Sequence, residues 1–160
     1  MIANGVVQSK LSYLITVWGN AQLYLLKALQ TQPLIAARTV CGPLSSRWSR
    51  FKLLSTVKWL SVRQMIVYFT ILQAHKTLLS GKPAVLFGLF DQDIPYQTRG
   101  ASNGHIRSKR NLTSTKTFAY RAMIWYNRVP EDVKWGSLTL VKCKLKKWVK
   151  SNVTIDLIQQ

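Results

Sequence analysis

The fold is indicated most clearly by the stretch Thr117-Phe-Ala-Tyr-Arg-Ala-Met-Ile-Trp-Tyr-Asn-Arg-Val-Pro130. Apolar side chains recur in it at helical spacing, so they share one face of a predicted helix, at Phe118, Ala122, Trp125 and Val129. Pro130 lacks an N–H group and disfavours helix in the residue before it. The predicted helix should therefore end at this proline.

A second helix is predicted beyond the acidic turn Glu131–Asp132, over Leu138–Asn152. One stripe of this helix contains Leu138, Val141, Leu145, Trp148 and Asn152. Lysines cover its other side, at Lys142, Lys146, Lys147 and Lys150. The two segments together predict an aromatic-rich helical hairpin whose outer helix is cationic.

Helical patterns also cover most of the chain before this hairpin. They predict helices over 2–17 and 21–41 and a central helix over 61–79, with a short helix over 84–90. The central helix is apolar almost all round, and Ser61 with Gln64 forms a capping box at its start. The segment 2–17 is mostly apolar, so we expect much of its surface to be buried.

The segment between residues 91 and 115 is polar and contains Pro95, Gly100 and Gly104 among several basic residues. This composition predicts a basic irregular loop, and a short β-hairpin near residues 98–108 is one form it could take. The sequence as a whole predicts an all-α fold of about five to seven helices. We expect a single helical domain over residues 1–150 and a C-terminal tail over residues 151–160.

The charge of the chain is strongly unbalanced. It has 23 Lys and Arg residues against five acidic residues, for a net charge of +18. A chain this cationic repels itself unless a polyanion neutralises it. Nucleic acid is the leading candidate partner, because phosphate contacts by Lys and Arg release condensed counterions. An anionic membrane surface is the alternative, and solubility alone is the simplest explanation.

The scarcity of acidic residues argues against metal-dependent catalysis. Phosphoryl transfer needs carboxylates that hold cations beside the reacting phosphate. Asp91 and Asp93 could hold a metal, but the pair is more typical of a solvated loop. Cys41 and Cys143 form no metal-binding or redox motif, and we expect both to be reduced. The sequence therefore predicts no enzyme activity, no metal site and no cofactor.

The sequence also predicts an intracellular protein, either nuclear or cytoplasmic. No stretch of about 20 apolar residues occurs, so no transmembrane segment is expected. The first residues lack the cationic-then-apolar order of a signal peptide.

The segment 46–54 interleaves cations with aromatic residues, including Arg47, Trp48, Arg50 and Phe51. This pattern suits single-stranded nucleic acid, through phosphate neutralisation and base stacking. An amphipathic helix with Trp48, Phe51 and Leu54 in the core explains it equally well. The two interpretations can coexist on opposite faces of one helix.

Several motifs, taken in order, resemble the C-terminal part of reverse transcriptases from non-LTR retrotransposons of the LINE or jockey type. The resemblance covers roughly residues 6–152 and rests on order and spacing. Its motifs are Lys10-Leu-Ser-Tyr13 with Trp18-Gly19, Trp59-Leu-Ser-Val-Arg-Gln64, Tyr96-Gln-Thr-Arg99, Phe118-Ala-Tyr-Arg121 and Asn127-Arg-Val-Pro130.

The resemblance implies that the chain corresponds to the thumb and the region after the palm of such a polymerase. The family's catalytic carboxylates lie upstream, in a Tyr/Phe-x-Asp-Asp motif that this chain does not contain. The implied partners are an RNA or RNA–DNA template–primer and the upstream palm. The residues expected to neutralise phosphates, with little sequence preference, are Arg38, Arg99, Arg107, Lys109, Arg110, Arg121, Lys142, Lys146, Lys147 and Lys150.

The chain departs from the family pattern at Pro33, which lies within a predicted helix, and at Leu34 and Ile35, where relatives usually carry polar and basic residues. This departure fits a fragment or degraded copy that keeps residual nucleic-acid binding. Two alternatives remain open. One is an independent basic nucleic-acid-binding protein, and the other is a protein of anionic membrane surfaces that uses the helix 138–150.

Overall fold

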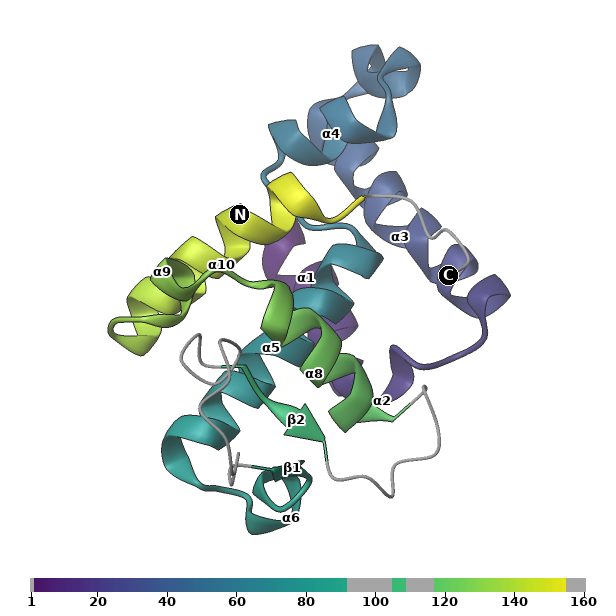
Figure 1. The fold of residues 1–160 in the computed structure, drawn as a ribbon. Coiled ribbons are helices and arrows are strands. Elements are labelled where there is room, and N and C mark those ends of the chain that lie inside the picture. The colour runs from purple at the N-terminus through teal and green to yellow at the C-terminus, as the bar shows by residue number, and fades with distance from the viewer. Residues whose placement is uncertain (1, 92–104, 109–116, 155–160) are drawn as a thin grey trace. The chain divides into compact units, whose positions relative to one another are not determined.

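The structure of the protein is a computed structural model that describes residues 2–91, 105–108 and 117–154 (Figure 1). Within these ranges the fold is all-α, as predicted, and six α-helices have seven or more residues. The elements are α1 (Ile2–Ser12), α2 (Ile15–Trp18), α3 (Leu23–Cys41), the 3-10 helix η1 (Pro43–Arg47), α4 (Arg50–Thr56), α5 (Val62–Ser80), α6 (Ala84–Phe87), β1 (Phe90–Asp91), β2 (Arg107–Ser108), α8 (Phe118–Arg128), α9 (Glu131–Lys134) and α10 (Leu138–Asn152).

The chain divides into two compact units. Unit 1 consists of Met1–Ile66 and Lys150–Gln160, and unit 2 consists of Val67–Val149. The expected boundary at residue 150 falls inside α10, which continues to Asn152. The residue that follows this helix, Val153, is buried, so the start of the predicted tail is part of unit 1.

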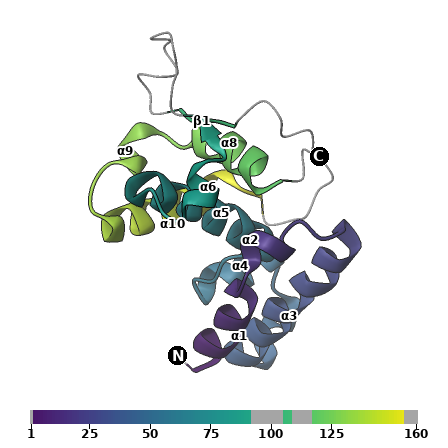
Figure 2. The same ribbon diagram turned by 90° about the horizontal axis from the view of Figure 1, so that it is seen from below.

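Unit 1 is built around α3, which packs against α1, η1 and α4 (Figure 2). The α3–α4 contact encloses a hydrophobic cluster, hereafter the Leu53 cluster, of Leu34, Ala37, Leu53, Leu54 and Trp59. Trp48 packs against this cluster, but Phe51 is 67% exposed. The core interpretation of segment 46–54 therefore holds for Trp48 and Leu54 and fails for Phe51.

The capping box predicted at the start of α5 is present. The Ser61 N–H donates to Gln64 Oε1 at 3.1 Å, and the Gln64 N–H donates to Ser61 Oγ at 3.2 Å. Gln64 also donates through Nε2 to the Val153 carbonyl at 3.0 Å. The Val62 N–H donates to Gln30 Oε1 at 2.8 Å, which joins α3 to this helix start. Buried side chains thus satisfy backbone groups that a helix end leaves without a helical partner.

The expectation of one largely buried helix over residues 2–17 is wrong. The helix breaks at Tyr13–Leu14, where Leu14 adopts a left-handed conformation with φ of 47°. The Trp18 indole closes this bend by donating to the Tyr13 carbonyl at 2.7 Å. Among the side chains described in residues 5–17, Ile15 alone is buried. The segment has apolar residues on every side, so periodicity could not indicate which side meets the core.

Unit 2 contains a two-stranded antiparallel ladder that pairs Phe90 with Ser108 and Asp91 with Arg107. Strand β2 lies at the end of the range predicted for a hairpin, but its partner β1 precedes that range, and residues 92–104 lie outside the described part. Helix α8 contacts β2 (Figure 1). Asn127 of α8 accepts from the Ile106 N–H at 2.8 Å and donates to the Ile106 carbonyl at 2.9 Å. This pair of hydrogen bonds, hereafter the Asn127 bracket, holds the residue before β2 against α8.

Both helices predicted for the hairpin are present, and the buried face of each differs in part from the predicted one. Thr117 caps α8 by accepting from the Tyr120 N–H, and the helix ends before Pro130, as predicted. Its buried residues are Ala119, Ala122 and Tyr126, whereas Phe118 and Trp125 are half-buried. Tyr126 is therefore the aromatic residue of α8 that is buried, in place of the predicted Phe118 and Trp125. Helix α10 has the predicted bounds and buries Val141, Leu145 and Val149. The predicted stripe is therefore wrong at its end, because Trp148 is half-buried and Asn152 is exposed.

Candidate nucleic-acid interface

Helix α10 presents cations from the side opposite its buried residues. Lys146 and Lys147 are exposed, and Lys142 is half-buried. The neighbouring Lys144 is held in place because its ammonium donates to the Asp132 carbonyl at 2.6 Å. In unit 2, α10 therefore offers two predicted phosphate ligands, Lys146 and Lys147, directly to solvent.

Arg38 lies near the end of α3 and is exposed. It lines a shallow hollow of about 360 Å³ with Thr39, Gly42, Pro43, Ser45 and Ser46. Ser45 is buried and donates through its hydroxyl to the carbonyls of Arg38 and Gly42, which fixes the turn that closes the hollow. The guanidinium of Arg38 is thus carried on a rigid helix end.

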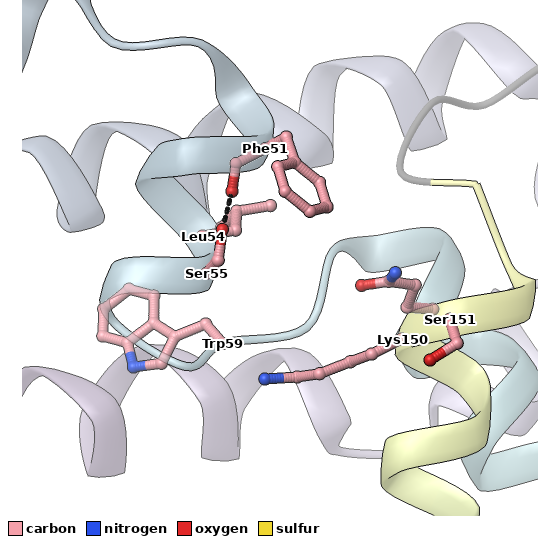
Figure 3. A pocket seen from close by; sticks show the side chains of 7 residues that line it. Phe51, Leu54, Ser55, Trp59, Lys150 and Ser151 are labelled. Carbon is pink, nitrogen blue, oxygen red and sulfur yellow. Dashed lines mark hydrogen bonds between the residues drawn. The ribbon is translucent and has the colours of Figure 1, made fainter.

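Lys150 lines a pocket of about 400 Å³ in unit 1 (Figure 3). Its half-buried side chain extends along the pocket toward Trp59, and its ammonium donates to the Lys58 carbonyl at 3.2 Å. Lys58 has a left-handed backbone with φ of 59°, in the turn after α4. The other residues that line the pocket are Phe51, Leu54, Ser55, Trp59, Gln64 and Ser151.

The remaining predicted phosphate ligands differ in accessibility. Arg107 is exposed on β2. Arg121 is half-buried on α8, and burial lowers the pKa of its guanidinium, so only part of this side chain is available to a ligand. Arg99, Lys109 and Arg110 lie outside the described residues. The structure thus places exposed predicted cations on separate elements, namely Arg38 in unit 1 and Arg107, Lys146 and Lys147 in unit 2.

The two units differ in how many acidic residues accompany their basic residues. Unit 1 carries nine Lys and Arg residues against one carboxylate, Asp156, which lies outside the described residues. Residues 1–66 contain no acidic residue at all. Unit 2 carries 14 Lys and Arg residues against four carboxylates. The described part of unit 1 therefore has no carboxylate that could neutralise its cations.

A buried pair of titratable side chains lies in unit 2. His75 Nδ1 is 3.2 Å from the Tyr126 hydroxyl, and both residues are less than 10% exposed. The Lys134 ammonium lies 4.6 Å from the centre of the Tyr126 ring. Burial lowers the pKa of His75, and the charge of Lys134 lowers it further. Because both side chains are buried, we assign the pair to the packing of unit 2.

The buried imidazole should make stability depend on acid pH. Burial lowers the pKa of His75 in the folded state, whereas an unfolded histidine titrates near pH 6.5. As pH falls below about 6.5 the unfolded chain binds more protons, so the free energy of unfolding should fall by up to about 1.4 kcal/mol per pH unit. Urea unfolding at a series of pH values measures this slope. His75→Gln should flatten it. An equal slope in wild type and His75→Gln would contradict the buried neutral imidazole.

Comparison with protein families, with curated proteins and with solved structures gave no match to this chain. None of the helices in the described ranges combines the length and the apolar character that a membrane crossing requires. Across the same ranges, no group of three or more His, Cys, Asp or Glu side chains could hold a metal ion.

Proposed function

We propose that this chain binds the phosphate backbone of nucleic acid, as the C-terminal segment of a non-LTR retrotransposon reverse transcriptase that holds the template–primer. The observation that carries the proposal is the distribution of charge. Residues 1–66 contain eight Lys and Arg residues and no carboxylate, within a chain of net charge +18. Such a segment is stabilised when a polyanion supplies the missing negative charge.

The exposed cations suit contacts with the backbone more than the reading of bases. Lys146 and Lys147 present exposed ammonium groups on α10, and an ammonium group acts as a point charge toward phosphates. Arg38 offers a fork of donors that can hold two oxygens of one phosphate. Contacts of this kind position a protein on nucleic acid without selecting a sequence. The ordered motifs that resemble the retrotransposon polymerases favour a template–primer as the natural ligand.

The proposal predicts that affinity for nucleic acid falls steeply with salt. The logarithm of the affinity should decrease linearly with the logarithm of salt concentration, by about 0.7 per phosphate neutralised on a single strand. Replacing both Lys146 and Lys147 with glutamine should reduce that slope by about 1.4. Fluorescence anisotropy of a labelled RNA at several salt concentrations measures both quantities.

A matched control replaces two lysines of unit 2 that are exposed but not assigned to the interface, Lys76 and Lys82. This double variant loses the same net charge and should keep a slope close to that of wild type. Binding that is independent of salt would refute the proposal. Binding to anionic vesicles that RNA does not displace would instead support a function at membrane surfaces.

A further inference from the structure

The pocket beside Lys150 is lined by an exposed aromatic ring, by buried apolar side chains and by a cation. Phe51 projects into it from α4, and Trp59 and Leu54 form its apolar wall, both less than 10% exposed. Lys150 and Ser151 border it from the last turn of α10 (Figure 3). All of these residues belong to unit 1. The volume, about 400 Å³, lies in the range of ligand pockets, about 300–1,000 Å³.

Phe51 has no structural reason to be aromatic. Its neighbours on α4, Leu53 and Leu54, belong to the Leu53 cluster, and Trp48 packs against the same cluster. The Lys52 ammonium lies 4.8 Å from the centre of the Trp48 ring. Phe51 takes no part in this packing and leaves 67% of its surface exposed at the mouth of the pocket. An exposed ring and a cation that line the same pocket, as Phe51 and Lys150 do, suit a nucleobase that stacks while its phosphate is neutralised.

The charges around the pocket favour an anionic ligand. Lys150 lines the pocket, and the Lys150 ammonium donates to the Lys58 carbonyl. Further cations are exposed on α4 and the turn that follows, namely Arg50, Lys52 and Lys58. No carboxylate occurs in residues 1–66 to oppose them. A ligand that suits the pocket therefore has one flat apolar face and one negative charge, which are the two parts of a nucleotide.

Two polar side chains of the pocket, those of Gln64 and Ser55, form hydrogen bonds within the protein. Gln64 uses Oε1 for the cap of α5 and Nε2 for the Val153 carbonyl. The Ser55 hydroxyl donates to the Phe51 carbonyl. These groups are poorly placed to read the edge of a base. Recognition in the pocket should therefore depend on stacking, which all bases provide, and should tolerate any sequence.

We propose that this pocket holds one base of a single-stranded nucleic acid, stacked on Phe51, with the adjoining phosphate near Lys150. The inference rests on the proposed nucleic-acid binding and adds a site that recognises bases to one that contacts phosphates. A base inside a duplex is stacked on its neighbours and paired, so the pocket selects single strands or strand ends.

The test compares two synthetic strands of equal length and charge. One is a labelled oligothymidylate, and the other carries abasic sites at every position but the labelled end. The full chain should bind the thymidylate on the order of tenfold more tightly. Phe51→Leu should remove this difference and leave affinity for the abasic strand unchanged, while Phe51→Tyr should retain it. Circular dichroism confirms that the variants fold, which is expected because Phe51 is exposed.

Tyr24→Leu is the matched control, since it removes another aromatic ring of unit 1 that is 65% exposed and lies outside the pocket. This variant should still prefer the thymidylate. Equal affinity of wild type for both strands, with the expected salt dependence, would overturn the pocket and leave backbone binding intact. An equal loss in Phe51→Leu and Tyr24→Leu would also overturn it. Failure of both strands to bind would overturn the two proposals together.

Discussion

Replacing Leu53 with alanine is expected to lower the free energy of unfolding by about 2–5 kcal/mol. Leu53 is fully buried at the centre of the Leu53 cluster, where α3 packs on α4. The substitution removes the branched end of the side chain and leaves a cavity that the surrounding helices fill only in part. Because domains are stabilised by only about 5–15 kcal/mol, this loss is a large share of the total. Urea unfolding followed by circular dichroism measures it.

Leu44→Ala is the matched control for this prediction. It makes the same chemical change in unit 1, but Leu44 is 85% exposed on η1. Its effect should remain within about 0.5 kcal/mol. If Leu53→Ala unfolds at the same urea concentration as wild type and Leu44→Ala, the α3–α4 interface cannot be packed as the structure places it.

Helix ends that a local signal marks were the features most open to prediction from the sequence. Without such a signal the prediction was wrong, because the short helix predicted over 84–90 ends at Phe87 and Phe90 lies in β1. Ser61 with Gln64 and the run ending at Pro130 are local signals, because capping and proline geometry depend on residues within one turn. The structure accordingly starts α5 at Val62, ends α8 at Arg128 and gives α10 the predicted bounds, Leu138–Asn152. Helix α3 likewise reaches Cys41, although it continues through Pro33.

Which face of a helix is buried was harder to predict, because it depends on segments distant in sequence. On α8 the predicted Ala122 and Val129 are buried, but Ala119 and Tyr126 are buried in place of the predicted Phe118 and Trp125. The partnership of β1 with β2 joins residues about 17 positions apart, and no local pattern marks a two-residue strand. The Asn127 bracket on Ile106 is equally non-local.

In the candidate site, too, features that depend on distant segments could not be predicted from the sequence. Lys146 and Lys147 could be found from the sequence because helical periodicity alone places them opposite Val141 and Leu145. The pocket at Phe51 could not, because it needs the last turn of α10 to lie beside α4 within unit 1. Most of the predicted phosphate ligands lie between residues 99 and 150. The absence of carboxylates in residues 1–66 was already visible in the sequence and points to unit 1 as well.

Between pH 10 and pH 12 the protein is expected to lose about 2–3 kcal/mol of stability through Tyr126. Burial raises the pKa of Tyr126 to about 12, whereas an unfolded tyrosine titrates near 10. In this interval the unfolded chain releases a proton that the folded chain keeps. The unfolded state is therefore favoured as pH rises, by up to about 1.4 kcal/mol per pH unit. The stabilisation is complete below pH 10 and lost above the folded pKa.

Urea unfolding of wild type and Tyr126→Phe at pH 8, 10 and 12 separates this effect from general alkaline unfolding. Phenylalanine keeps most of the packing but loses the hydroxyl beside His75, so the variant should be less stable at pH 8 by about 1 kcal/mol. Above pH 10 its stability should decline less than that of wild type, because it has no phenol to ionise at this position. Tyr24→Phe removes an exposed phenol and should follow the wild-type curve.

Parallel curves for wild type and Tyr126→Phe would mean that the Tyr126 hydroxyl is not enclosed with His75. The alkaline loss would then have to arise elsewhere, for example at Tyr68, whose pKa is raised by burial and by the charge of Cys143.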